Sequence, residues 1–299
     1  MKYLFALALC GLIAGCANCQ THDTAVDVGG HRLNFHITRG TGMPILFEGG
    51  AGADETVFDT ILKPLEEITH ATLITYARAG SGGSELDTSN HILEKHGLLQ
   101  DIEGLETALK KLGYNRNIVL VAHSYGGFCA TLYAARHPST VKAAVLIDAN
   151  LACWFLDSYV DSITQLRKEL FAAQKDTNWA NYYPTMNLPN TVALMRKTPF
   201  PANIPAIELV SEINFPDSTW ARRWRECHRQ FAAAEPNRED ITAYGCGHFI
   251  FRDNPPLAIS AIVKAYAGAQ PKAEADEVMK RYLSYSLEAF DEIKKKKVP

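Results

Sequence analysis

The sequence lacks an excess of positive charge, a dense set of cysteines and any internal repeat or low-complexity tract. Its 299 residues carry 30 Lys and Arg against 33 Asp and Glu, a net charge of −3. No basic surplus is available to neutralise a phosphate backbone, so a nucleic-acid partner is not expected. The composition, 47% hydrophobic and 21% charged, is ordinary for globular proteins and argues against disorder.

The sequence also lacks an apolar run long enough to span a bilayer near its N-terminus. Residues 3–13 are uncharged but too short for a transmembrane helix, and with Lys2 before them they are typical of a secretory signal. The run ends Ile13-Ala14-Gly15-Cys16, which resembles a bacterial lipobox. We expect residues 1–15 to be a signal peptide and Cys16 to carry lipid, anchoring the protein extracytoplasmically to a bacterial membrane. A plain secretory signal and an uncleaved anchor are the alternatives.

Seven cysteines are too few for a disulfide framework. Removal of Cys10 and lipidation of Cys16 would leave an odd number of thiols, so at least one stays unpaired or pairs between chains. A Cys227–Cys246 bridge and two separate buried thiols are both compatible with the sequence. Cys16 and Cys19 form a C-x-x-C without a second pair, so no metal site is evident, and no cofactor is expected.

The body of the chain alternates predicted strands and helices. Apolar alternation on either side of Gly29-Gly30 predicts a β-hairpin at residues 25–37. Further strands are predicted at residues 44–47, 72–76, 118–121, 141–147, 206–210 and 240–244. The intervening helices are predicted at residues 57–65 with Asp54 as N-cap, 92–112, 128–135, 218–234 and 256–266. This order predicts the α/β class, with a mostly parallel sheet flanked by helices.

Residues 150–204 break the alternation, because they are rich in aromatic residues and proline. We therefore predict a linker at 16–24, a core formed by 25–149 and 205–268, and an inserted helical cap at 150–204. The apolar spacing within residues 269–299 predicts an additional helix, in which Val278, Tyr282 and Tyr285 share a face. We expect this helix to pack on the domain, with contact to an anionic membrane surface or a partner as the alternative.

A candidate nucleophile lies between a buried strand and a helix. Ala122-His123-Ser124-Tyr125-Gly126 fits a Gly-x-Ser-x-Gly nucleophile elbow with Ala122 in place of the first glycine. The tight turn requires small residues two positions before and after the serine. The following helix directs its free N–H groups toward the reacting oxygen. Ser124 is therefore the predicted nucleophile.

A serine hydroxyl needs a base to become a good nucleophile. His248 follows the last predicted strand and is flanked by Gly245 and Gly247, which would let its imidazole reach Ser124. His123 adjoins the nucleophile, but its side chain is expected to point away from the hydroxyl.

Four motifs together resemble the α/β-hydrolase superfamily across residues 25–268. They are the glycine turn at residues 49–52, the segment 76–84, the Ser124 elbow and Gly247-His248. The resemblance implies the α/β-hydrolase fold and serine chemistry with a Ser-His-acid triad. Glu48 and Ala77 depart from the usual His and Asp, which leaves the packing of these loops open.

The resemblance leaves the third triad member open. Family members usually carry an Asp after the strand at residues 206–210, where this chain has Asn214. Others, including haloalkane dehalogenases, carry the acid after the preceding strand, where Asp148 lies. Asp148 is the predicted acid, and Glu212 and Asp217 are the alternatives.

The oxyanion hole is expected to use the backbone N–H groups of Tyr125 and, by similarity to the family's His-Gly-Gly pattern, Gly50, with Ala51 as the alternative. The predicted function is that of a carboxylesterase (EC 3.1.1) that hydrolyses a small-molecule ester through an acyl-enzyme. One alternative is an aminopeptidase or amidase, which needs an acidic cap residue to hold a free amine. The acidic cap candidates are Asp157, Asp161, Glu169 and Asp176. The other alternative is a non-catalytic, lipid-anchored binding protein.

Overall fold

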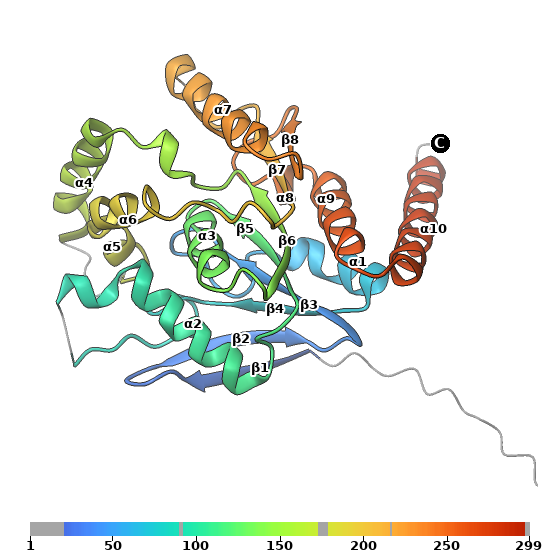
Figure 1. The fold of residues 1–299 in the computed structure, drawn as a ribbon, viewed down its shortest axis with the longest axis horizontal. Helices are drawn as coiled ribbons and strands as arrows, with labels where there is room; N and C mark the ends of the chain where they lie inside the picture. Colours follow the sequence, from blue (N-terminus) through green and yellow to red (C-terminus); the bar gives the residue numbers. More distant parts are fainter. Residues whose placement is uncertain (1–20, 90–91, 173–178, 216, 297–299) are drawn as a thin grey trace, which may run out of the picture.

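The computed structural model describes residues 21–89, 92–172, 179–215 and 217–296. Its centre is an eight-stranded sheet of order β1-β2-β4-β3-β5-β6-β7-β8 (Figure 1). β1 pairs antiparallel with β2 and β2 antiparallel with β4, and every pairing from β4 to β8 is parallel. The strands are β1 (Thr21–Asp27), β2 (Arg32–Thr38), β3 (Gly42–Glu48), β4 (Ala71–Tyr76), β5 (Ile118–His123), β6 (Val141–Ile147), β7 (Ala206–Ser211) and β8 (Arg238–Ala243).

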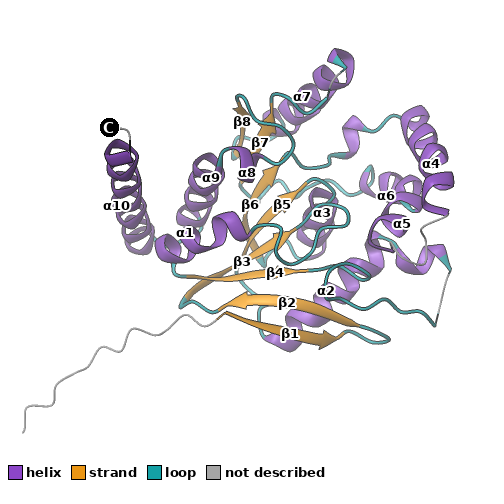
Figure 2. Ribbon diagram, turned by 180° about the vertical axis from the view of Figure 1, so that it is seen from behind, coloured by secondary structure: helices purple, strands orange, loops and turns teal. Residues whose placement is uncertain are grey.

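Helices cover both faces of this sheet (Figure 2). One face carries α1 (Asp59–Thr69), α8 (Ile250–Asp253), α9 (Pro255–Gly268) and, outside them, α10 (Lys272–Lys296). The other face carries α2 (Leu98–Leu112), α3 (Gly126–Arg136) and α7 (Ser218–Ala233). Because both faces are covered, every residue of β4, β5 and β7 is buried, as expected for parallel strands. The predicted α/β class with a mostly parallel sheet is confirmed.

Three local predictions differ from the structure. β1 begins at Thr21, so residues 21–24 are strand and the linker predicted at 16–24 is too long. Gly97 divides the helix predicted at 92–112 into a short 3₁₀ helix, η1 (Leu93–His96), and α2. Asp54 does not cap α1, which begins at Asp59. Its carboxylate instead accepts hydrogen bonds from the backbone and hydroxyl of Thr56.

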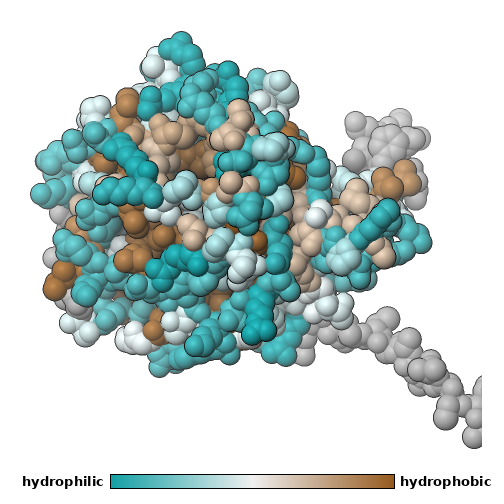
Figure 3. Space-filling view, in the orientation of Figure 1, coloured by the Kyte–Doolittle hydropathy of each residue, from teal (hydrophilic) through white to brown (hydrophobic). Residues whose placement is uncertain are grey.

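The described residues of the range 150–204 form a helical segment beside the carboxyl ends of β5 and β6. It consists of η2 (Ala152–Trp154), α4 (Asp157–Ala172), α5 (Trp179–Met186) and α6 (Leu188–Met195). Apolar side chains gather on this part of the surface (Figure 3), and Leu166 and Leu170 of α4 are exposed there. The extent of the cap as a separate domain stays a prediction.

A disulfide bond joins this segment to the core. Cys153 of η2 pairs with Cys227 of α7, with their Cα atoms 5.7 Å apart. Both arrangements that the sequence allowed, a Cys227–Cys246 bridge and two separate thiols at these positions, are therefore wrong, because Cys227 is bonded to Cys153. Cys246 lies in the loop after β8 and is a buried free thiol, as is Cys129.

The C-terminal helix packs on the core, as the sequence predicted. Val278 of α10 is buried among α1 and α9 side chains, and Tyr282 and Tyr285 lie against the same cluster. Arg281 Nε also donates a hydrogen bond to the Ile68 carbonyl at 2.6 Å. The predicted signal peptide, Cys16 and Cys19 lie outside the described residues. Among the described helices, none combines the length and the apolarity that crossing a bilayer would require.

Candidate active site

Ser124 lies at the tight turn between β5 and α3. Its φ of 54° is left-handed, a strained conformation for a residue with a Cβ. Gly126 packs so closely on β3 that a Cβ there would collide with the Glu48 carbonyl. Ala122 is a buried β5 residue that pairs with Glu48, and its methyl group is accommodated. The local geometry is that of the predicted elbow.

His248 and Asp148 are brought together from positions 100 residues apart. Asp148 follows β6, and His248 lies in the loop between β8 and α8. The His248 Nδ1 atom lies 2.6 Å from Asp148 Oδ2. With the proton on Nδ1, this hydrogen bond leaves Nε2 free to accept a proton.

The surroundings of Asp148 keep its carboxylate ionised. Oδ1 accepts hydrogen bonds from the backbone N–H and the hydroxyl of Ser211, at 3.0 and 2.9 Å, and from Trp224 Nε1 at 2.7 Å. Oδ2 accepts hydrogen bonds from Asn214 Nδ2 at 2.5 Å and from His248. Burial by itself would raise the pKa of Asp148. The hydrogen bonds and the charge of His248 outweigh it, so this pKa lies below its ordinary value.

The other acid candidates have different partners. Asn214, at the position where many relatives have the acid, donates to Asp148 instead. Glu212 Oε2 accepts a hydrogen bond from the Gly245 backbone N–H at 2.8 Å. Asp217 caps the N-terminus of α7 by accepting from Thr219 and Trp220. Neither Glu212 nor Asp217 is bonded to His248.

His123 packs against His248, and among the described residues no hydrogen bond joins its ring to the Ser124 hydroxyl. Its Nε2 atom lies 2.9 Å from the His248 carbonyl, and the two rings are 4.5 Å apart. Burial, the nearby charge of His248 and other smaller effects lower the pKa of His123 to about 3, so this ring stays neutral. It supports the loop that carries His248.

Ser124 and His248 line one cavity of about 240 Å³ between the core and the cap. Within the described residues, no direct hydrogen bond joins the Ser124 hydroxyl to the imidazole. Such contacts are often long before substrate binds. The remaining lining is mostly aromatic and aliphatic: Ala51, Tyr125, Asn150, Trp154, Phe155, Tyr159, Ile163, Arg167, Pro184, Thr185, Leu188, Asn214, Phe215 and Trp224.

A buried ionic cluster holds the glycine turn beside Ser124. Arg78 donates one hydrogen bond to the Gly49 carbonyl at 2.9 Å and another to the Gly50 carbonyl. Its guanidinium lies 3.8 Å from the Glu48 carboxylate, which also accepts a hydrogen bond from the Tyr76 hydroxyl at 2.8 Å. With both carbonyls bound to Arg78, the backbone of this turn is fixed in one orientation. Glu48, noted in the sequence as a departure from the usual His, belongs to this cluster.

The two candidate donors of the turn are placed differently. Ala51 lines the cavity with Ser124, whereas a Cβ at Gly50 would lie 3.3 Å from the Ser124 Cβ. Tyr125 immediately precedes the first residue of α3, where helix N–H groups lack carbonyl partners. The backbone of Tyr125 and that of the glycine turn therefore both lie close to Ser124.

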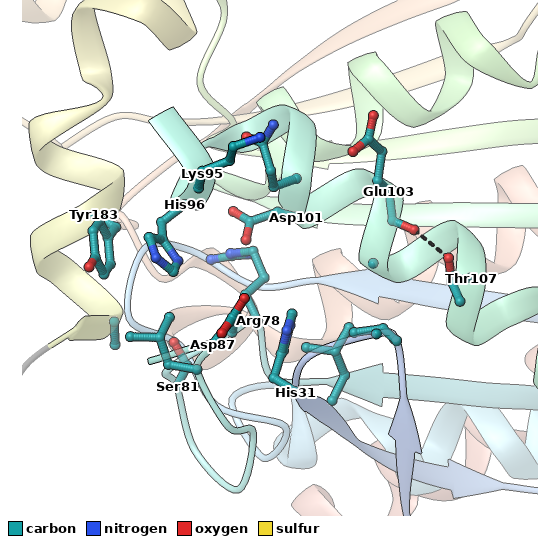
Figure 4. A pocket seen from close by; sticks show the side chains of 18 of the residues that line it. His31, Arg78, Ser81, Asp87, Lys95, His96, Asp101, Glu103, Thr107 and Tyr183 are labelled. Atoms are coloured by element: carbon teal, nitrogen blue, oxygen red, sulfur yellow. Dashed lines mark hydrogen bonds between the residues drawn. The ribbon is translucent and has the colours of Figure 1, made fainter. Parts of the chain in front are cut away.

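A second cavity, of about 400 Å³, lies behind this turn. Arg78, Asp101, His31 and His96 face into it (Figure 4). The cap helix α5 borders both cavities, since Pro184 lines each of them. In the part of the chain that the structure describes, no cluster of three or more His, Cys, Asp or Glu side chains is arranged to hold a metal ion.

Comparisons with known proteins point to one family. The model of the alpha/beta hydrolase fold matches residues 44–195, about half of the chain. The uncharacterized protein YqjL of Bacillus subtilis is 21% identical over 239 residues, covering 80% of this chain and 89% of that protein.

Solved structures show the same fold. A thermophilic esterase from Thermogutta terrifontis is 18% identical with a TM-score of 0.61, covering 84% of this chain and 100% of that one. The haloalkane dehalogenase DatA from Agrobacterium tumefaciens is 16% identical with a TM-score of 0.62, covering 84% of this chain and 97% of that one. These neighbours act on different substrates, so they show the architecture and leave the reaction open.

Proposed function

The chain belongs to the α/β-hydrolase fold family, and from that premise we propose that it is a serine hydrolase that cleaves small carboxylic esters through an acyl-enzyme. The observation that carries the proposal is the hydrogen bond between the ionised Asp148 and His248, whose side chain lines one cavity together with Ser124. This arrangement supplies the nucleophile, the base and the group that orients the base.

In the proposed reaction, Ser124 attacks the ester carbonyl while His248 accepts the hydroxyl proton on Nε2. Asp148 keeps the imidazole in the required tautomer and stabilises the imidazolium that forms. The backbone N–H groups of Tyr125 and Gly50, with Ala51 as the alternative to Gly50, would stabilise the oxyanion of the tetrahedral intermediate. His248 then protonates the leaving alcohol, and water releases the acid from the acyl-enzyme by the same steps.

A serine nucleophile favours acyl transfer over the alkyl transfer that opens an epoxide or displaces a halide. Attack of Ser124 on a saturated carbon would leave an alkyl ether, which water does not cleave under mild conditions. Attack on a carbonyl leaves an ester, which His248 and water can hydrolyse. Among the activities named for its structural neighbours, the residue at the elbow therefore supports ester or thioester hydrolysis.

The aminopeptidase alternative is less well supported by the cavity. A free α-amine needs an acidic partner, yet the described residues that line the cavity include no aspartate or glutamate. Asp157 pairs with Arg196 at 2.6 Å, and Asp161 and Glu169 do not line the cavity. Asp176 lies outside the described residues.

Labelling with a fluorophosphonate probe tests the proposal, because the probe phosphonylates only activated serines. The wild-type protein is expected to be labelled and Ser124→Ala is not, since the variant lacks the nucleophile. Wild type should also release p-nitrophenol from short-chain esters. Absence of Ser124-dependent labelling in folded protein would contradict serine chemistry and support the non-catalytic binding protein instead.

A further inference from the structure

The cavity above Ser124 contains one fixed positive charge. Among the described residues that line it, Arg167 is the one lysine or arginine, and none is a carboxylate. The nearest acid of the site, Asp148, is fully buried behind Trp224 and His248 and is bonded to both. A substrate in this cavity therefore meets an apolar wall, neutral amides and hydroxyls, and one guanidinium.

Helix geometry places Arg167 on the α4 row that forms one wall of the cavity. Tyr159, Ile163 and Arg167 are spaced four residues apart on α4 and all line the cavity, so they form one row on the helix. At 1.5 Å per residue, Arg167 lies about 12 Å along the axis from Tyr159. Tyr159 packs against Trp154, with ring centroids 4.8 Å apart. The charge of Arg167 nevertheless acts on the Tyr159 hydroxyl, whose pKa burial raises and Arg167 lowers, so the guanidinium lies along the same aromatic wall.

Arg167 is also available to a ligand. Two other exposed arginines are held in ion pairs, Arg136 with Glu106 and Arg196 with Asp157, each at 2.6 Å. Arg167 has no ion pair or hydrogen bond to any residue that the structure describes. A guanidinium presents a planar fork of N–H groups that matches a carboxylate in a bidentate pair. The single positive charge of Arg167 is balanced by a monoanion such as a carboxylate, whereas it would neutralise only half the charge of a phosphate dianion.

We propose that the substrate is an ester with a hydrophobic body and a free carboxylate several bonds from the reacting carbonyl, called a half-ester below. Arg167 binds the carboxylate of this substrate. The inference rests on the proposed ester hydrolysis and adds its substrate class. Arg167 would act as a specificity-determining residue. The aromatic wall holds the hydrophobic body, and the guanidinium selects the charged end.

Two p-nitrophenyl esters of equal chain length test this assignment: p-nitrophenyl octanoate, and the mono-p-nitrophenyl ester of octanedioic acid. Arg167→Gln is expected to lower kcat/KM for the half-ester about fivefold to tenfold, mainly through KM, and to leave the octanoate within about twofold. Arg167→Glu should reduce half-ester hydrolysis further by repulsion. Lys168 is a neighbouring charged residue on α4 that does not line the cavity. Lys168→Gln is therefore the matched control and should leave kcat/KM unchanged for both substrates.

Ionic strength gives a second readout. Added salt should lower the preference for the half-ester in wild type and leave the ratio unchanged in Arg167→Gln, because salt screens a charge pair that the variant lacks. An unchanged substrate ratio in Arg167→Gln, with octanoate still hydrolysed, would overturn the assignment of Arg167 and leave the esterase proposal standing. If the wild-type protein hydrolyses neither ester and Ser124 is not labelled, the proposed function itself is refuted.

Discussion

Asp148 accepts five hydrogen bonds, from Ser211, Asn214, Trp224 and His248, and is the residue on which the proposed mechanism depends most. In the sequence, Asp148 was preferred to Glu212 and Asp217 as the triad acid only because its position resembles that of the acid in some α/β-hydrolases. Its support from Trp224 and Ser211 was not predicted, because these residues lie on α7 and β7 and meet Asp148 only after the sheet has formed.

Asp148→Asn should lower kcat on p-nitrophenyl esters by about 10³-fold to 10⁴-fold, because an amide donates to the imidazole and holds the wrong tautomer. Steady-state kinetics measure this effect. Asp217→Asn is the control: asparagine also caps helices well, so activity and stability should stay near wild type. Normal turnover in Asp148→Asn would move the role to another acid.

Glu48 predicts a pH dependence of stability. Burial raises the pKa of this carboxyl to about 7, although Arg78 and Tyr76 oppose the rise. In the unfolded chain the pKa is about 4.3. Between these values the folded state binds more protons than the unfolded state, so stability falls as pH rises from about 5 to 7.

Glu48→Gln removes this titration while keeping the shape of the side chain. The free energy of unfolding in urea is measured for both proteins at pH 5 and pH 7.5. Wild type should lose at least about 1 kcal/mol relative to the variant over this interval. Asp101, whose pKa burial also raises, to about 6, interacts with Glu48, so the comparison is repeated in an Asp101→Asn background to isolate Glu48. A difference that is the same at both pH values would show that Glu48 keeps an ordinary pKa.

At the scale of elements, the disulfide ties η2, which carries Trp154, to α7, which carries Trp224. Both tryptophans line the cavity above Ser124, and their rings lie 5.3 Å apart. The bridge closes a loop of 74 residues that contains α4, α5 and α6. It therefore holds η2 and the cavity wall that it carries against the core helix α7.

Cys153→Ser should lower the free energy of unfolding by about 4 kcal/mol, because the open loop gains conformational freedom in the unfolded state. Urea unfolding with and without a reductant measures it, and reductant should destabilise wild type but not the variant. Cys246→Ser, which alters a free thiol, should remain sensitive to the reductant. A wild-type protein indifferent to reductant would contradict the bridge.

For the whole molecule, we propose that the chain is exported and lipidated at Cys16, with the disulfide as support, since such bonds persist in oxidising compartments. β1, an edge strand of the sheet, begins at Thr21. A lipid on Cys16 would then hold this edge within about 18 Å of the membrane surface, given about 3.5 Å per extended residue.

The mass of the mature protein tests the anchor. Expression of the full chain in a bacterium should give a product that lacks residues 1–15 and carries a diacylglycerol on Cys16. Cys16→Ser should abolish the lipid and release the protein from the membrane fraction. An unmodified Cys16 at a cleaved N-terminus would support the plain secretory signal, and retention of residues 1–15 would support the uncleaved anchor.

The sequence by itself determined the order of strands and helices, because apolar spacing and turn residues act locally. It also predicted the elbow at Ser124, because the steric demand of that turn falls on neighbouring residues. It could not determine the Cys153–Cys227 pairing, the support of Asp148 by Trp224, or the Glu48–Arg78 cluster. Those contacts join residues far apart in the chain. They stabilise the protein only in the folded state, because burial on both faces of the sheet then removes the contacting side chains from water.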